Sequence, residues 1–221
     1  MLEGLQLFDD REERPAALNM AIDEALLVES AAPLLRFYRW QRPSISFGYF
    51  GHYAEVAPES DRYELVRRWT GGGIVPHGAG VDVTYSLVIP RDHFFFQRSS
   101  LEIYATVHDA IRRALQANGV EAFLASDPAP KTSEACFANA VRSDVLSGGQ
   151  KIAGAAHRRT RAGLLHQGSI QQDDLPERFR EDFARFLCPQ FERSTLAPGL
   201  SERAAAIAEK KYGTNEWLTR W

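Results

Sequence analysis

Apolar residues recur with the 3.6-residue period of an α-helix in several segments of the chain. Leu18, Ile22 and Leu26 lie on one face of the first such segment. Pro15 precedes them and suits the first turn of a helix. The pattern therefore predicts a helix near residues 15–30. The same period predicts further helices over 99–119, 175–187 and 201–213.

Alternation of apolar and polar positions predicts β-strands elsewhere. Val83, Tyr85 and Leu87 alternate with Thr84 and Ser86 in the clearest run. Strands are predicted over 34–40, 44–50, 64–69, 83–89, 142–159 and 163–171, with a turn at 147–149. Helices and strands follow one another without a regular strand–helix–strand repeat, which predicts an α+β fold.

The composition is that of a globular chain with one sizeable core. The 221 residues are 44% hydrophobic and 25% charged, and their number suggests a single domain over 1–221 with no accessory domain. The net charge of −3 gives no reason to expect nucleic acid as a partner. Apolar runs fall short of the ~20 residues of a membrane span, and the acidic N-terminal segment does not resemble a signal peptide. No membrane association is therefore expected.

The two cysteines are Cys136 and Cys188. They are too few for a disulfide framework, and they fit the reducing cytoplasm, which is the expected location. Cys136 follows a loop predicted over 126–134, where a mobile thiol would be able to carry an acyl group as a thioester. The alternative for Cys136 is a buried small hydrophobe. Cys188 has no polar neighbours in sequence and is expected to be structural.

A run of three glycines is the sharpest chemical feature. Gly71, Gly72 and Gly73 let a backbone approach a ligand closely. Arg68 precedes them and His77 follows, so backbone N–H groups and a cation would be able to hold a carbonyl, a carboxylate or a phosphate. The spacing matches neither a phosphate-binding P-loop nor a dinucleotide fingerprint. A plain hairpin turn is the alternative.

Lys151 is the second candidate, because small residues surround it. On a regular strand it would share a face with Ala153, Ala155 and His157. A lysine among small apolar residues is placed to pair with or activate an anion. From these residues alone, a solvated lysine on an edge strand is the favoured alternative.

Histidines and serines give weaker signals. His166 and Gln167 lie on opposite faces of a predicted strand, and a shift of one residue would exchange them, so the sequence leaves open which of the two faces a ligand. The six histidines show no metal-ligand spacing, and no metal site is predicted. A serine hydrolase is not predicted either, because the chain has no Gly-x-Ser-x-Gly motif.

Four segments together resemble the superfamily of lipoate–protein ligase A, octanoyltransferases and biotin–protein ligases. The segment RRWTGGGIVPHGAGVDVTYSLVIP resembles its glycine-loop signature, and GGQKIAGAAHRRTRAGLLHQGSI resembles its lysine signature. NMAIDEALL and RFYRW match its first helix and second strand. The resemblance covers about residues 1–175. It implies an α+β catalytic domain with a mixed, mostly antiparallel sheet flanked by helices.

The resemblance also implies site roles. Lys151 would contact the activated carbonyl, and Gly154 and Ala155 would leave a slot for the apolar tail. The other residues expected to bind substrate are Arg68, Gly71, Gly72, Gly73, His77, His166 and Gly168.

Two branches of the superfamily compete. In the cysteine-dependent octanoyltransferases a Cys-Phe pair precedes the lysine by fifteen residues, and Cys136-Phe137 precede Lys151 by that interval. This favoured branch implies transfer of octanoyl from acyl carrier protein, through Cys136, to a lysine of a lipoyl domain or glycine-cleavage H protein. It needs no tightly bound cofactor.

The second branch is ATP-dependent lipoate ligase, which would use ATP, magnesium and lipoate. Its loop is usually Gly-Gly-Gly, as here, and residues 142–144 resemble its Arg-Asn-Asp motif. A third hypothesis is a non-catalytic binder of lipoyl domains. The retained Lys151 and glycine loop argue against it. A biotin ligase would carry a Gly-Arg-Gly-Arg loop, which is absent.

Overall fold

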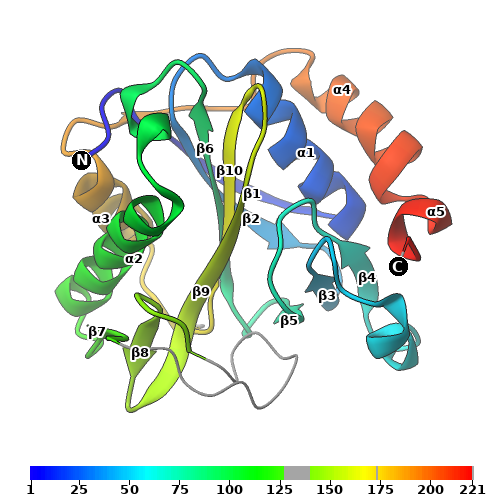
Figure 1. Cartoon of the computed structure of the whole chain (residues 1–221), viewed down its shortest axis with the longest axis horizontal. Coiled ribbons are helices and arrows are strands. Elements are labelled where there is room, and N and C mark those ends of the chain that lie inside the picture. Colours follow the sequence, from blue (N-terminus) through cyan, green and yellow to red (C-terminus); the bar gives the residue numbers. More distant parts are fainter. Residues whose placement is uncertain (127–139, 173, 221) are drawn as a thin grey trace.

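The computed structural model describes residues 1–126, 140–172 and 174–220, which form two sheets and their flanking helices (Figure 1). The larger sheet has the strand order β11-β1-β2-β6-β10-β9-β8-β7, and the smaller has the order β4-β3-β5. The first four strands are β1 (Gln6–Arg14), β2 (Leu34–Trp40), β3 (Ser44–Phe47) and β4 (Glu64–Arg67). The next four are β5 (Val75–His77), β6 (Val83–Pro90), β7 (Phe123–Leu124) and β8 (Val145–Ser147). The last three are β9 (Gln150–Arg159), β10 (Gly163–Ile170) and β11 (Glu192–Arg193).

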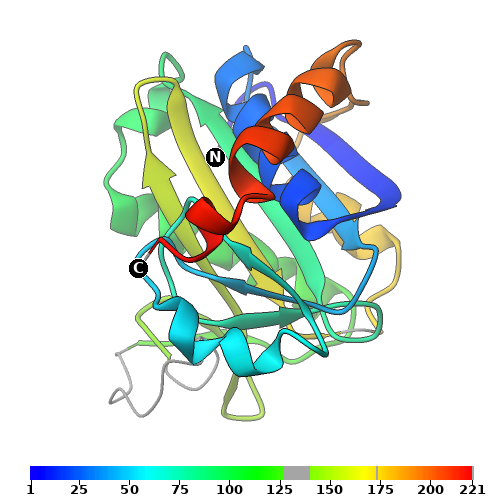
Figure 2. The ribbon, with the colours of Figure 1, turned by 90° about the vertical axis from the view of Figure 1, so that its right-hand side faces the viewer.

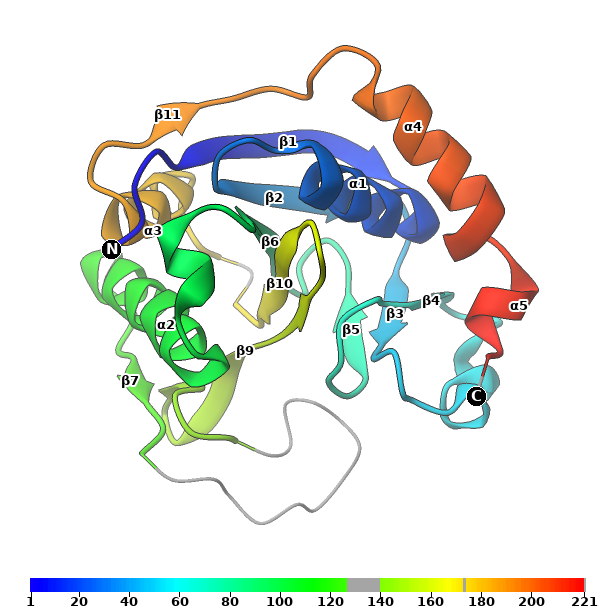
Figure 3. The ribbon, with the colours of Figure 1, turned by 45° about the horizontal axis from the view of Figure 1, so that its top comes forward.

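Helices cover both faces of the larger sheet. They are α1 (Ala16–Glu29), α2 (Ser100–Ala117), α3 (Arg178–Leu187), α4 (Leu200–Ile207) and α5 (Asn215–Leu218). Figure 3 shows α2 and α3 on one side of the strands and α1 and α4 on the other. Strands β1, β2 and β11 run parallel to one another, whereas β2, β6, β10, β9, β8 and β7 pair antiparallel in turn. The expectation of a mixed, mostly antiparallel sheet flanked by helices is confirmed.

Alternation along the central strands divides the core into two apolar clusters. Tyr85 and Leu87 of β6 pack with Phe37 against the side of α2 and α3. Val88 and Tyr38 pack with α1 and α4 on the opposite side. Each strand of the sheet centre is therefore buried on both faces, as a layered domain requires.

The face toward α1 contains a buried ionic network that the sequence does not signal. Arg36 of β2 is fully buried, and its guanidinium lies 2.7 Å from Asp10 and 2.9 Å from Asp23. The side-chain oxygen of Asn19 accepts a further hydrogen bond from Arg36 at 2.8 Å. Asn19 and Asp23 lie beside the apolar stripe of α1, yet both are buried because the network satisfies their polar atoms.

Most predicted elements are found, with several differences in detail. The strand expected over 44–50 ends at Phe47, and the helix expected over 175–187 begins at Arg178. The helix expected over 201–213 is α4 followed by a π-helical turn over Ala208–Tyr212. Strands β1, β5, β7 and β11 and helix α5 are additional elements. The loop expected over 126–134 falls almost wholly outside the described residues.

The glycine run is not a hairpin turn. Strand β4 pairs with β3, β3 pairs with β5, and β6 belongs to the larger sheet. The glycine run therefore joins β4 to β5, which lie on either side of β3 in the smaller sheet, and residues 78–82 then lead to β6 in the larger sheet. Figure 2 shows the small sheet below α1 and the C-terminal helices, seen from that side. Within the described ranges, no helix has the length and apolar character needed to cross a bilayer.

Candidate active site

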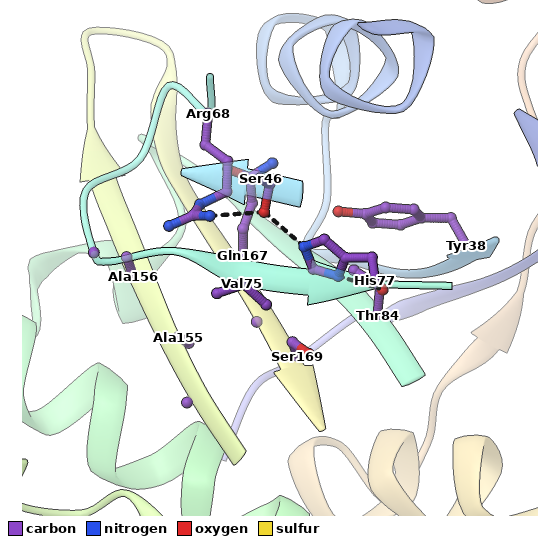
Figure 4. A pocket seen from close by; sticks show the side chains of 13 residues that line it. Tyr38, Ser46, Arg68, Val75, His77, Thr84, Ala155, Ala156, Gln167 and Ser169 are labelled. Carbon is purple, nitrogen blue, oxygen red and sulfur yellow. Dashed lines mark hydrogen bonds between the residues drawn. The ribbon is translucent and has the colours of Figure 1, made fainter. Parts of the chain in front are cut away.

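A cavity lies between the two sheets, beside the glycine run that joins β4 to β5 (Figure 4). Strands β9 and β10 supply one wall, and β3, β5 and the glycine run supply the opposite wall. The residues that line the cavity are Tyr38, Ser46, Arg68, Gly72, Val75, His77, Thr84, Gly154, Ala155, Ala156, Gln167, Gly168 and Ser169. Two segments far apart in sequence, each singled out by its residues, thus meet at one cavity.

The glycine run is held by close backbone packing against the end of β3. A Cβ added at Gly48 would lie 2.0 Å from the carbonyl oxygen of Gly72, which no side chain tolerates. Gly72 has φ +88°, in the left-handed region that favours glycine. A Cβ at Gly72 would also lie 3.4 Å from Ala156 across the cavity. Backbone atoms, rather than side chains, therefore form this wall of the cavity.

Arg68 holds the loop in place. Its Nη2 donates hydrogen bonds to the carbonyl oxygens of Gly71 (3.0 Å) and Gly73 (2.9 Å), and its Nη1 donates to the Ser46 hydroxyl at 2.7 Å. The guanidinium is buried and lines the cavity. It therefore fixes the carbonyls of the glycine run while its charge stays beside the cavity.

His77 is fixed on three sides. Its Nδ1 lies 2.8 Å from Asp82, and its Nε2 lies 2.6 Å from the Ser46 hydroxyl. The indole of Trp40 stacks on the imidazole, with ring centres 4.3 Å apart and planes inclined by 16°. Burial acts to raise the pKa of Asp82, but His77 and the hydroxyls of Ser169 and Thr84 outweigh it and hold that pKa below its ordinary value. Asp82 is thus a carboxylate at neutral pH.

The register of β10 determines which of two neighbouring side chains faces the cavity. Gln167 pairs with Ser86 on the polar face of the sheet and lines the cavity. Its amide nitrogen donates to Asp23 at 2.8 Å, and its amide oxygen accepts from Thr70 at 2.8 Å. Gln167 therefore connects the buried network under α1 to the glycine run.

His166 points to the opposite side of the sheet, so it does not line the cavity. Its Nε2 lies 3.2 Å from the Tyr85 hydroxyl, among the rings packed against α2. His166 was expected to bind substrate. Side chains alternate along a strand, and because Gln167 lies on the cavity side, His166 lies on the other side. Gly168 lines the cavity through its backbone, since a Cβ there would point into the Tyr85 ring.

Small residues on β9 leave room along the other wall. Gly154, Ala155 and Ala156 all line the cavity. Their side chains extend no further than a methyl group, so an extended thin ligand would be able to lie against the strand. The family resemblance implies such a slot at Gly154 and Ala155.

Lys151 lies beside this wall as a buried ion pair. Its Nζ is 2.8 Å from a carboxylate oxygen of Asp144, and the two side chains are 5% and 0% exposed. The alternative of a solvated edge-strand lysine is therefore wrong. The β8–β9 pairing shifts register here, with Leu146 opposite Lys151 and Val145 opposite Ala153. This shift interrupts the regular alternation that would place Lys151 and Ala153 on one face.

Asp144 organises the surroundings of Lys151 and was not singled out as a site residue by sequence. Its carboxylate accepts hydrogen bonds from the Tyr104 hydroxyl and, at 2.7 Å, from the backbone N–H of Val141. The Tyr104 hydroxyl in turn accepts from the N–H of Ala155 at 3.3 Å. The lysine, its counter-ion and the cavity wall are thus joined by one network.

Of the two cysteines, Cys136 lies outside the described residues. Cys188 is buried among apolar residues, as expected for a structural thiol. The described part of the chain holds no group of three metal-binding side chains placed to bind an ion.

The model of the lipoyl protein ligase A/B catalytic domain matches residues 15–209. The chain belongs to this family. It is 38% identical to octanoyltransferase LipM of Oceanobacillus iheyensis over 172 residues, a match that covers 74% of this chain but only 62% of that protein. It is 34% identical to octanoyltransferase LipM of Symbiobacterium thermophilum, over 96% of this chain and 97% of that protein.

Solved structures show the same fold. Protein Ta0514 of Thermoplasma acidophilum, solved with bound lipoic acid, superposes with a TM-score of 0.80 at 22% identity, covering 99% of this chain and 100% of that one. A lipoate–protein ligase A solved with ATP gives a TM-score of 0.73 at 23% identity, covering 99% of each chain. The expected lipoate ligase-like catalytic fold is therefore confirmed.

Proposed function

We propose that the chain is an acyltransferase that moves an octanoyl or lipoyl group onto a specific lysine of a lipoyl domain or glycine-cleavage H protein. The observation that carries the proposal is the narrow cavity walled by Gly154, Ala155 and Ala156 beside the buried Lys151–Asp144 pair. A thin apolar chain fits small residues, and a reacting carbonyl needs a cation or hydrogen-bond donors nearby. Relatives named octanoyltransferase support the same chemistry.

The first step of the proposed reaction loads the enzyme. The thiolate of Cys136 attacks the thioester carbonyl of octanoyl-acyl carrier protein, and the carrier thiol leaves with a proton. The support is the Cys-Phe pair fifteen residues before Lys151 in the sequence. A thioester stores enough reactivity for the next step, so this route needs neither ATP nor a tightly bound cofactor.

In the second step the acceptor lysine attacks the Cys136 thioester as a neutral amine. A tetrahedral oxyanion forms and collapses, with the amide as product and the Cys136 thiol as leaving group. We assign Lys151 to the carbonyl end of the cavity, where its ammonium would stabilise the oxyanion. Asp144 pairs with that ammonium at 2.8 Å and orients it.

A ligase that uses ATP, magnesium and lipoate is the second candidate. The Gly-Gly-Gly sequence favours it, because backbone N–H groups and the buried Arg68 suit a phosphate or acyl-adenylate. The fold shared with an ATP-bound lipoate–protein ligase A is compatible with it. The third candidate is a binder of lipoyl domains without catalysis. The proposed setting is cytoplasmic, with no nucleic acid or membrane involved.

One experiment separates the candidates. The protein is incubated with octanoyl-acyl carrier protein and a lipoyl domain, without ATP, and intact masses are recorded. The transferase predicts an octanoyl adduct on Cys136 and a modified lipoyl domain. The Cys136→Ser variant should lose both products, whereas Cys188→Ala, the matched cysteine control, should keep them.

Other results select the other candidates. Modification of the lipoyl domain only with ATP and free acid identifies a ligase. Acylation at the wild-type rate by Cys136→Ser would eliminate the thioester route. Lys151→Ala should stop acylation by either enzyme, and binding of the lipoyl domain with no modification under any condition identifies the binder.

A further inference from the structure

A chain of short hydrogen bonds links a serine, a histidine and an aspartate at the cavity. The Ser46 hydroxyl lies 2.6 Å from Nε2 of His77 (Figure 4). Nδ1 of the same imidazole lies 2.8 Å from Asp82. Ser46 and His77 line the cavity, and the Asp82 side chain is fully buried behind them. The proposed acyl transfer through Cys136 does not use these three hydrogen-bonded side chains together.

The donors around Ser46 determine where its proton lies. Arg68 has no acceptor atom, so its Nη1 must donate to the Ser46 oxygen at 2.7 Å. The Ser46 O–H is then left to donate to Nε2 of His77. The carboxylate of Asp82 accepts the N–H at Nδ1. This is the protonation pattern of a serine nucleophile with its base and its orienting acid.

The surroundings hold this pattern rigidly. Thr84 and Ser169 both donate to the same Asp82 oxygen, at 2.8 Å and 2.7 Å. Trp40 stacks on the imidazole and donates its indole N–H to Thr84 at 2.8 Å. Fixed orientation of the base is what nucleophilic catalysis requires of such a group.

We propose that Ser46, His77 and Asp82 are a second acyl-transfer centre, which hydrolyses medium-chain acyl thioesters bound in the cavity. The chain lacks a Gly-x-Ser-x-Gly motif, but such centres are recognised by geometry and roles rather than by sequence position. The inference takes only its substrate class from the proposed function. It does not depend on Cys136.

The reaction balances in two steps. The Ser46 oxygen attacks the thioester carbonyl while His77 takes the hydroxyl proton at Nε2; the thiolate leaves and receives that proton. Water then attacks the Ser46 ester, passing one proton to Nε2, and the proton returns to the Ser46 oxygen as the free carboxylic acid leaves. The Arg68 guanidinium donates to the Ser46 oxygen and would stabilise negative charge on that oxygen. The glycine run lies beside Arg68, and its residues belong to no strand of either sheet.

The test measures thiol release from an octanoyl thioester of N-acetylcysteamine in the absence of any acceptor protein. All variants carry Cys136→Ala, so that the cysteine route is removed. We expect turnover to persist in this background and to fall by about 100-fold or more when Ser46→Ala is added. Ser44→Ala is the matched control, because Ser44 is a buried serine on the same strand that bonds the Arg42 carbonyl.

Two further readouts keep the test decisive if Ser46→Ala folds poorly. Ser46→Cys retains a nucleophile beside His77, and brief reaction followed by peptide mass analysis should find the octanoyl group at position 46. The inference is overturned if turnover is unchanged by Ser46→Ala, or if Ser46→Cys folds and is labelled elsewhere only. Lipoyl-domain acylation by the wild type, run in parallel, tests the proposed function separately: Ser46-dependent hydrolysis without it would overturn that function alone.

Discussion

The side chain of Lys151 lies across the α-carbon of Gly154. A Cβ built at Gly154 would lie 2.5 Å from Cε and 2.8 Å from Nζ of Lys151. The lysine therefore reaches its counter-ion Asp144 only because position 154 has no side chain. The position of the Lys151 side chain thus depends on the absence of a side chain at Gly154.

Gly154→Ala should displace Lys151 and lower the melting temperature, because the buried pair with Asp144 would be broken. The added methyl meets the end of a flexible side chain rather than backbone, so the lysine swings away and the fold remains. Misplacement of a reacting group by about 1 Å costs up to ~100-fold in rate, and we expect a fall of about 10- to 100-fold in transfer to the lipoyl domain. Rates and melting temperature measured together check this.

A double variant provides the control for Gly154→Ala. If the methyl acts through Lys151, Gly154→Ala should lower the melting temperature of the wild type but not that of Lys151→Ala, where the side chain that it displaces is absent. Additive losses of melting temperature would show that the methyl disturbs the cavity wall independently of Lys151.

Asp144→Asn should destabilise the protein as well as inactivate it. The ammonium of Lys151 would remain nearly buried beside a neutral amide, and breaking a buried pair from one side costs about 3–5 kcal/mol. Urea unfolding measures the change. Combining it with Lys151→Met should recover part of the stability but none of the transfer activity, and a double variant less stable than Asp144→Asn would contradict the pairing argument.

Local pattern predicted the helices and central strands because their apolar residues face the core. Strand β1 was missed because Asp9 and Asp10 break its apolar alternation. Asp10 is 3% exposed despite its charge, since Arg36 of the neighbouring strand pairs with it. That partner is distant in sequence, so no local pattern reveals that the polar residue is buried.

The glycine run and Lys151 were found from their residue types, but their partners were not. Ser46 is a single polar residue in ordinary sequence surroundings, and Asp144 ends the segment that resembles the ligase Arg-Asn-Asp motif, which does not reveal that it pairs with Lys151. Ser46 and His77 meet because β3 pairs with β5, and Lys151 reaches its counter-ion beside a register shift between β8 and β9. Pairing and register are properties of the folded sheets, which alternation alone leaves open.

Gly48→Ala should displace the glycine run from its position against the end of β3. A methyl group at Gly48 would collide with the Gly72 carbonyl at 2.0 Å, and this carbonyl belongs to the backbone, so it cannot turn aside as a flexible side chain would. We expect a lower melting temperature and loss of acyl transfer. For stability, Gly71→Ala is the matched control, because a Cβ there has nothing within 4 Å. Equal melting temperatures for the two variants would refute the close-packing argument.

Histidines gather behind the cavity, on the side of α2. His108 is fully buried, and its Nδ1 donates to the Ser143 carbonyl at 2.8 Å. Within the described ranges, Nε2 of His108 and Nδ1 of His157 and His166 are buried without a hydrogen-bond partner. Burial lowers the pKa of His108 to about 4, although the nearby negative charge of Asp144 acts to raise it. Burial also lowers the pKa of His157 and of His166.

Stability should therefore fall as the solution is acidified. The unfolded chain binds a proton at each of these histidines near pH 6.5, whereas folded His108 resists it until about pH 4. The stabilisation is fully present above the unfolded pKa and is lost between these limits, by up to about 3 kcal/mol for His108. His108→Asn keeps a donor for the Ser143 carbonyl but does not titrate, so its free energy of unfolding should fall less steeply between about pH 7 and pH 4.5. His52→Asn, at an exposed position, should retain the wild-type slope, and a His108→Asn profile parallel to the wild type would show that carboxylates alone produce the acid sensitivity.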